Sequence, residues 1–440
     1  MEKVSVSKAL ETTSGTQKYQ FSILIISILS SFACSITIFS LPFMFSSIHG
    51  DPNATTSFEI IDDKDHTRFL LINQFYIGIL LSIIPSSLFL DKFGRAAILK
   101  FIIPYFIALS LISSLALTYR ILFFTLLLLG FVFYTLMISS LILLSESIPY
   151  KSIPMFLLLI SLSYVLGQLY TSLMYICKIN WRITLGSSGL IGFLTNYYAQ
   201  KILESPEWVY LKNHIPEAEK IFMAISAVNN VGVFKHRLIE KNNITSFANY
   251  WRMNKRLIIL SCILWINAIM GYMIVCLYPI GLNDDIYINA LFYFLAHVVA
   301  IGIILILSFI RNRIFVLIPF IVLSRIGILL LGLCDESETE FWKIGFLIVV
   351  VRVCLDIEIY YIGKIILEEF CVEIRSFGLG LCLAFGVVGG FFVLEYPLYS
   401  SYIGILGFSS ILAWVFTASI RKSKENEEKI ENLLFEIESM

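Results

Sequence analysis

Charged residues are scarce in this chain. Asp, Glu, Lys and Arg together make up 15% of its 440 residues, and 32 basic side chains offset 32 acidic ones. A net charge of zero predicts neither a nucleic-acid partner nor an acidic one, so only the placement of the charges is informative. Hydrophobic residues make up 58% of the chain, and its mean hydropathy is +0.84. This composition indicates a membrane protein and excludes soluble enzymes and DNA-binding proteins.

Paired cysteines and phosphate-binding loops are lacking too. The eight cysteines stand singly, mostly inside apolar runs and without the CxxC spacing of a metal site: Cys34, Cys177, Cys262, Cys276, Cys334, Cys354, Cys371 and Cys382. We therefore expect them to be small core residues, and we expect no metal or other cofactor. The absence of a nucleotide-binding motif argues against a nucleotide partner and against ATP-driven transport.

A cleavable leader is not predicted either. Residues 1–20 are polar, and the apolar run after them is too long for the hydrophobic region of a signal peptide. We expect this run to remain as the first membrane span, preceded by a cytosolic N-terminus.

Long apolar runs dominate the rest of the sequence. Each is near the roughly 20 residues that a helix needs to cross a bilayer. The runs are too continuously apolar for barrel strands, which would alternate. An all-α membrane protein with twelve spans is predicted, at about 21–45, 70–90, 98–118, 121–144, 152–177, 182–200, 256–280, 288–310, 314–334, 342–364, 376–397 and 400–420.

The connections between the runs alternate in charge. Basic residues gather in every second one, including nine within 201–256, whereas 51–65, 284–285 and 335–340 are acidic. Basic connections belong in the cytosol, so both termini are expected there, in a multi-pass protein of the plasma membrane. Asn53, in an Asn-Ala-Thr sequon of the first outer connection, is then the expected glycosylation site. The sequon at Asn243 falls in the cytosolic segment and should stay unmodified.

Six runs on either side of a polar segment favour a secondary transporter, with two related bundles around a central cavity. The number of spans alone also allows a channel or a receptor, so the motifs must decide. The predicted parts are a cytosolic N-terminus at 1–20, a six-helix bundle at 21–200, a central cytosolic loop with an amphipathic helix at 201–255, a second six-helix bundle at 256–420 and a cytosolic tail at 421–440.

The connection between the second and third runs holds a short motif, Asp91-Lys92-Phe93-Gly94-Arg95. It resembles the loop motif of the major facilitator superfamily, in which Asp, Gly and Arg lock neighbouring helix ends together. Gly94 suits a tight turn, and Asp91 can face the positive end of a helix. An ordinary basic cytosolic loop remains the alternative.

The central segment carries a longer pattern: Glu204-Ser205-Pro206-Glu207-Trp208, then a helix opened by Pro216 and ending in Asn229. Ile221, Phe222, Ile225 and Val228 of this helix form one apolar stripe. The pattern resembles that of the organic cation, organic anion and carnitine transporter family. The family usually has arginine where this chain has Glu207.

Further matches to that family follow in order between about residues 70 and 400. They include Glu146, Trp181-Arg182, Glu368, Arg375 and Gly389-Gly390. The resemblance implies a major facilitator fold and a group of gating residues, namely Asp91, Gly94, Arg95, Glu146, Glu368 and Arg375. Val387 stands where cation carriers typically have Asp and anion carriers Arg, so the charge of the substrate does not follow from that position.

Ionisable residues inside an apolar run are costly and need a partner or a wet cavity. Arg352, Asp356 and Tyr360 share one helix face through their i, i+4, i+8 spacing. Arg352 stands where the resembled family keeps a basic residue lining the transport cavity, so it is expected to contact an anionic group of the substrate. The alternative is a structural Arg352–Asp356 bridge, with Glu358 paired to Arg325.

Aromatic residues complete the predicted substrate site. Tyr272, Trp265 and Tyr360 can offer ring faces to a flat or cationic solute, although most aromatic residues of such a protein simply pack. His297 can support proton coupling, or it can be hydrogen-bonded within the bundle.

The leading hypothesis is a carrier, without catalysis, that moves a small organic ion or zwitterion across the lipid bilayer by alternating access. A sugar-like proton-coupled porter and a transport-dead paralogue acting as a sensor or scaffold are the alternatives.

Overall fold

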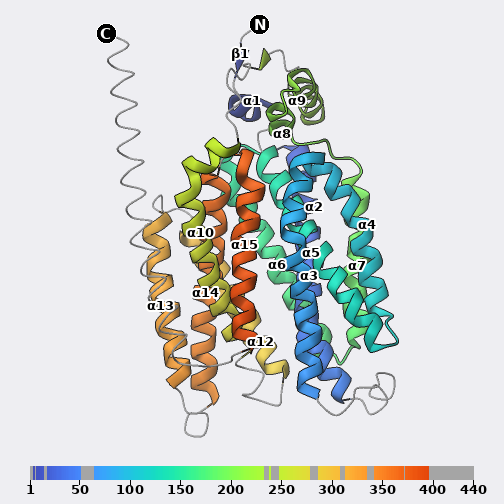
Figure 1. Cartoon of the computed structure of the whole chain (residues 1–440), viewed down its shortest axis with the longest axis vertical. Helices are drawn as coiled ribbons and strands as arrows, with labels where there is room; N and C mark the ends of the chain where they lie inside the picture. Colours follow the sequence, from blue (N-terminus) through green and yellow to red (C-terminus); the bar gives the residue numbers. More distant parts are fainter. Residues whose placement is uncertain are drawn as a thin grey trace.

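The computed structural model describes residues 3–4, 6–13, 17–50, 64–231, 237–238, 247–277, 286–307, 313–333, 341–370 and 372–395. Within these ranges the chain is built of long helices that run roughly side by side along one axis (Figure 1). A smaller cap sits on one end of this bundle.

The first half of the bundle corresponds to the first six predicted spans. Its helices are α2 (Lys18–Gly50), α3 (Lys64–Phe93), α4 (Arg95–Ser114), α5 (Tyr119–Ser147), α6 (Ile153–Ile176) and α7 (Trp181–Ala199), with a short 3-10 turn η1 (Tyr150–Ser152) before α6. The first two are longer than predicted, because helical backbone continues past the apolar run into polar residues on both sides of the first connection.

The second half corresponds to the next five predicted spans. Its helices are α10 (Phe247–Leu277), α12 (Ile286–Leu307), α13 (Arg313–Leu333), α14 (Phe341–Glu369) and α15 (Val372–Glu395). The predicted span at 400–420 lies outside the described residues.

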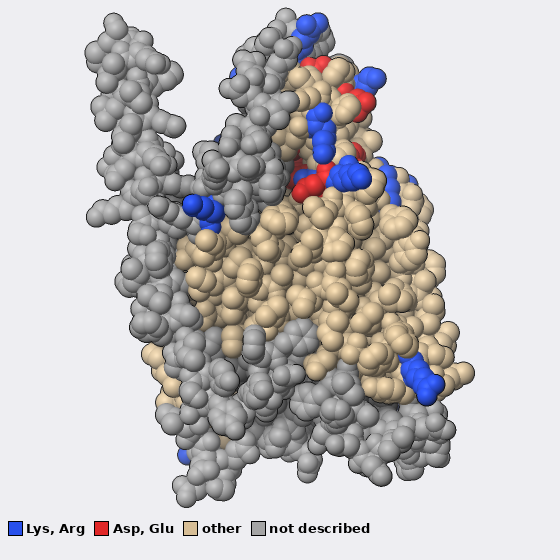
Figure 2. Space-filling model, in the orientation of Figure 1, with Lys and Arg blue, Asp and Glu red and all other residues tan. Residues whose placement is uncertain are grey.

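Five helices of the described part are long and apolar enough to cross a membrane, judged by length and composition. They are α2 to α6, while α10, α12, α13 and α15 contribute shorter apolar segments. Large apolar side chains such as Phe101, Phe124, Leu190 and Ile306 point outward and are more than half exposed. Figure 2 shows the same property as a broad band almost free of charged side chains. Such a belt suits contact with lipid.

Small residues let neighbouring helices of the first half approach closely. A Cβ atom on Gly78 of α3 would lie 1.9 Å from the Leu127 carbonyl oxygen of α5, and one on Gly130 of α5 would lie 2.0 Å from that of Phe75. Glycine at both positions is therefore required where these two backbones meet.

The two halves meet mainly along two pairs of helices. α3 packs against α15, and α6 packs against α12. Gly380 of α15 fits against Ser87 of α3, where any side chain at position 380 would collide with the Ser87 hydroxyl. These contacts define the interface at which a carrier of this type would hold its solute.

The cap consists of α1 (Val6–Thr13), α8 (Pro206–Leu211) and α9 (Ile215–Asn229), with β1 (Lys3–Val4) paired in parallel to β2 (Arg237–Leu238). We call this end of the molecule the α8–α9 end. Lys, Arg, Asp and Glu side chains gather there in Figure 2. The cap has its own apolar core, formed by Ala9, Leu10, Val209, Ala218, Phe222 and Leu238.

Two details of the cap differ from the prediction. Phe222 and Ile225 of α9 are buried as expected, but Val228 is 48% exposed, so the stripe ends one turn earlier. Residues 1–20 were expected only to be polar, yet they supply β1 and α1. The Asn229 amide fastens them: its oxygen accepts from the Tyr19 backbone N–H at 2.9 Å, and its nitrogen donates to the Thr13 carbonyl at 2.9 Å.

Candidate functional site

Arg95 is the centre of a buried charge cluster at the α8–α9 end. Its Nε lies 3.0 Å from Glu146 Oε2 of α5, one terminal nitrogen lies 3.1 Å from Asp91 Oδ1, and the other donates to the Leu90 carbonyl at 3.0 Å. Arg95 and Glu146 are almost fully buried. The cluster thus joins the ends of α3, α4 and α5, which is the arrangement that the loop motif predicted.

Glu204 explains why the loop motif and the central segment occur together. Its carboxylate caps α4, accepting from the backbone N–H groups of Arg95 at 2.7 Å, Ala96 at 2.8 Å and Ala97 at 3.2 Å. A carboxylate is favourable at a helix N-terminus, which carries the positive end of the helix dipole.

Gly94 is required by the same cap. Its φ of 105° is a conformation that residues with a side chain rarely adopt, and a Cβ atom there would lie 2.5 Å from Glu204 Oε2. The sequence predicted the glycine turn but not the capping role of Glu204.

Two polar contacts join the halves at the α8–α9 end. The Ser376 hydroxyl of α15 donates to Asp91 Oδ1 of α3, and Arg375 lies 3.9 Å from Glu207 of α8. Trp208 of α8 binds the same end of α3, since its indole N–H donates to the Asp91 carbonyl at 3.1 Å. Asp91 and Arg375 were predicted gating residues, whereas Ser376, Glu207 and Trp208 were not. The side chain of Glu368 lies outside the described residues.

A second buried charge cluster lies near the middle of α12 and α14. Arg352 is fully buried, and its guanidinium carbon lies 3.4 Å from the centroid of the Tyr272 ring of α10. Its Nε is 3.8 Å from Asp356 Oδ1, one turn further along α14. The stacked ring holds one face of the guanidinium and leaves its edge for charged partners.

His297 of α12 completes this cluster. Its Nδ1 lies 2.5 Å from Asp356 Oδ2, and its Nε2 lies 3.4 Å from a terminal nitrogen of Arg352. The imidazole also meets the ring of Phe39 of α2 edge-on, with 6.2 Å between the centroids. We call Arg352, Asp356, His297 and Tyr272 the central cluster; through Phe39 it reaches the other half of the molecule.

The remaining predicted residues occupy other places. The Tyr360 hydroxyl donates to the Pro154 carbonyl of α6 at 3.1 Å, so this residue bridges the halves. Trp265 is buried on α10, and its backbone carbonyl lies close to Gly386 of α15. Glu358 pairs with Arg325 of α13 at 3.0 Å and also accepts from Ser324, as the structural alternative predicted for this glutamate. Asn53 lies outside the described residues.

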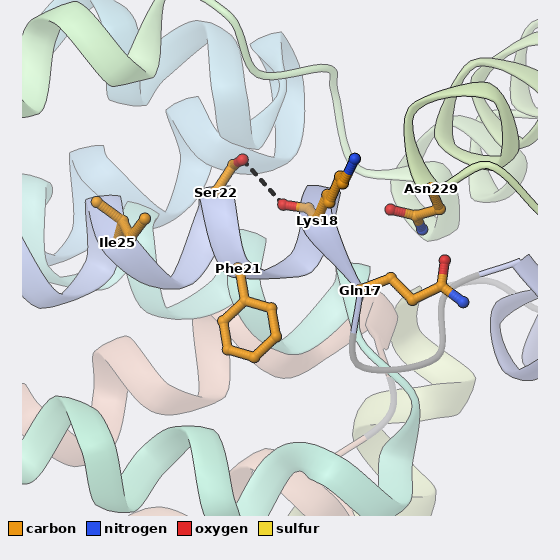
Figure 3. A pocket seen from close by; sticks show the side chains of 6 residues that line it. All are labelled: Gln17, Lys18, Phe21, Ser22, Ile25 and Asn229. Atoms are coloured by element: carbon orange, nitrogen blue, oxygen red, sulfur yellow. Dashed lines mark hydrogen bonds between the residues drawn. The ribbon is translucent and has the colours of Figure 1, made fainter.

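A shallow hollow of about 530 Å³ lies at the α8–α9 end, away from the central cluster. It is lined by Gln17, Lys18, Phe21, Ser22, Ile25 and Asn229, which Figure 3 shows along the first turns of α2 and beside the end of α9. Phe39, which touches the central cluster, is 21 residues beyond Lys18 on the same helix, a distance of about 30 Å. The hollow is therefore not the predicted substrate site.

Comparisons with known proteins agree with this architecture. The family model described as "Sugar (and other) transporter" matches residues 10–416. Organic cation/carnitine transporter 2 of Homo sapiens is 22% identical over 248 residues, and that of Mus musculus is 24% identical over 247. Each match covers 53% of this chain and 44% of the relative. The chain thus matches less than half the length of these curated relatives.

Solved structures of similar fold include the proton:xylose symporter XylE, a major facilitator superfamily protein, bound to 6-bromo-6-deoxy-D-glucose. Its TM-score is 0.68 at 16% sequence identity, and the matched region covers 91% of this chain and 95% of the XylE chain. XylE from E. coli in a partially occluded inward-open conformation has a TM-score of 0.69 at 15% identity, with 91% and 97% covered. At these identities the likeness concerns the fold alone.

Proposed function

Because this chain belongs to the Sugar (and other) transporter family, we propose that it moves a small organic ion or zwitterion across the membrane by alternating access. The family and the fold confirm the predicted major facilitator architecture, and membrane transport is the function class that follows.

The observation that carries the proposal is the central cluster. An ionised side chain at the centre of a bilayer costs about 2.5–3.5 kcal/mol on insertion scales. Arg352 is fully buried, and its Nε lies 3.8 Å from Asp356 Oδ1. A charge kept at this cost, beside the interface of the two halves, suits a solute that carries a charge of its own.

The curated relatives support the same class of solute. Their names state organic cations and carnitine. The central cluster offers a guanidinium and a carboxylate on one helix turn, so it presents a partner for either sign of charge. A neutral sugar site would use uncharged hydrogen-bonding groups instead.

The contacts at the α8–α9 end support alternating access. Asp91–Ser376 and Glu207–Arg375 join the halves at that end, and both lie where the halves would separate in a rocking motion. We assign this end to the cytosol, in keeping with the basic connections that converge there, and we place the protein in the plasma membrane.

The test is uptake into liposomes by the purified full chain. The panel contains a radiolabelled organic cation, a carboxylate, a zwitterion and a sugar, with protein-free liposomes as the control. We expect saturable uptake of a charged member, accelerated when the liposomes are preloaded with the same unlabelled solute, because alternating access couples the two directions. Uptake of the sugar alone would indicate a sugar porter, and no uptake at all would favour a transport-dead protein.

A further inference from the structure

The position of His297 between two opposite charges favours one tautomer. The negative charge of the Asp356 carboxylate, whose Oδ2 lies 2.5 Å from Nδ1 in an ion-pair contact, favours a proton on Nδ1. The guanidinium of Arg352 only donates, so the Nε2 atom 3.4 Å from it presents its lone pair. The neutral imidazole fits this arrangement, and the three side chains then have a net charge of zero.

A second proton on His297 changes this balance. It binds at Nε2, where it sets a positive imidazolium N–H directly opposite the guanidinium of Arg352. Two like charges at this separation repel each other strongly inside a membrane protein. An anion between them would accept hydrogen bonds from both, and a single carboxylate would return the net charge of the site to zero.

Four described helices contribute side chains to the surroundings of His297, and the charged ones come from α14. α14 supplies Arg352 and Asp356, and α10 supplies Tyr272 beneath the guanidinium. α2 presents the uncharged ring of Phe39, against which Tyr164 of α6 packs. The charge that faces His297 in the described structure therefore comes from α14.

From this geometry we propose that His297 and Arg352 form a joint site for one proton and one monocarboxylate, so that the anion moves together with the proton. The inference rests on the proposed function and deepens it by naming the anionic group and the coupling ion. The proton binds His297 Nε2 from water on the side where the cluster is open, and returns to water with the carboxylate on the other side. Each cycle then moves no net charge.

The experiment is uptake by the full chain in liposomes under an inward proton gradient of two pH units. The probes are radiolabelled lactate, hippurate and pyroglutamate, with tetraethylammonium as the cation. We expect the wild type to accumulate at least one monocarboxylate, up to the limit of about 100-fold that one proton per anion sets across two pH units. An imposed membrane potential should leave this uptake unchanged.

Two variants test the roles of the cluster. His297→Gln keeps the neutral arrangement, since its amide can donate to Asp356 and accept from Arg352 but cannot gain a proton; it should lose the stimulation by the gradient. Asp356→Asn leaves a charge of +1 without any added proton; its uptake should be independent of the gradient and sensitive to membrane potential. His214→Gln, at an exposed histidine before α9, should behave as the wild type.

The outcomes separate the inference from the proposed function. Monocarboxylate uptake that ignores the gradient in the wild type, or stimulation that persists in His297→Gln, would overturn the inference and leave the function standing. Uptake of tetraethylammonium without any monocarboxylate would do the same. Uptake of no probe would overturn the inference, and the proposed function would then be decided by the zwitterion of the first panel. If His297→Gln does not elute as a monodisperse protein, Asp356→Asn decides: gradient-driven uptake there would overturn the inference.

Discussion

At the scale of single residues, buried ion pairs fix the position of Arg95 at the α8–α9 end. The guanidinium of Arg95 has partners on two other helices, α3 and α5, and these protein groups balance its charge in place of water. A buried pair of this kind contributes little when compared with an apolar alternative, but it is costly to break by removing one partner.

Glu146→Gln should therefore lower the free energy of unfolding by about 3 kcal/mol, because Arg95 would remain buried without the carboxylate of Glu146, which is its fully buried partner. The thermal midpoint of the detergent-solubilised protein measures this loss. Glu217→Gln is the matched control, since Glu217 is 66% exposed and its change should stay within about 0.5 kcal/mol. Equal midpoints for Glu146→Gln and the wild type would contradict the buried-pair account.

The elements of the bundle were predictable because apolar runs of bilayer length leave few alternatives. The predicted span at 121–144 lies inside α5, which Thr118 caps at its N-terminus. The contacts between elements were not predictable in the same way. His297 and Asp356 are 59 residues apart on α12 and α14, and helical periodicity does not tell which faces of two apolar helices meet. Glu204 caps a helix 109 residues earlier in the chain.

The cap shows the same limit. Ala9 and Leu10 are ordinary residues of a polar segment, and only their packing on Phe222 gives α1 a place. Neither residue carries a sequence signal strong enough to predict a helix that docks on another segment more than 200 residues away.

Contacts between elements also set the equilibrium between the closed and open α8–α9 end. Glu207 of α8 and Arg375 of α15 lie 3.9 Å apart and are mostly buried. Glu207→Arg should weaken the closed end by about 1 kcal/mol, or about fivefold in population, because two positive charges would then face each other. The double variant Glu207→Arg with Arg375→Glu should restore the wild-type value.

Labelling of a cysteine placed at Ser87 by a membrane-impermeant maleimide measures this opening, since Ser87 is buried where α3 meets α15. The same variants without the added cysteine give the background from native thiols. A double variant that labels as fast as Glu207→Arg would show that the pair does not hold the end closed.

At the scale of the whole molecule, the charge pattern of the connections predicts a single orientation in the membrane. Expression in mammalian cells followed by deglycosylation should give one mobility shift, which Asn53→Gln abolishes because Asn53 lies in a predicted outer connection. Asn243→Gln is the control and should keep the shift. A glycan on Asn243 would show that the orientation is the reverse of the predicted one.

The central claim is that the central cluster binds the solute, and transport by variants of Arg352 and Asp356 tests it most directly. Arg352→Ala alone leaves Asp356 beside His297 without the neighbouring guanidinium, so a folding defect can imitate a transport defect. Arg352→Ala with Asp356→Ala removes both charges together. Uptake of the transported solute should then be measured in liposomes that contain equal amounts of monodisperse wild-type and doubly substituted protein. The account predicts that the double variant is recovered as well as the wild type but has lost nearly all uptake; a double variant that transports at the wild-type rate would show that both residues are structural and would contradict it.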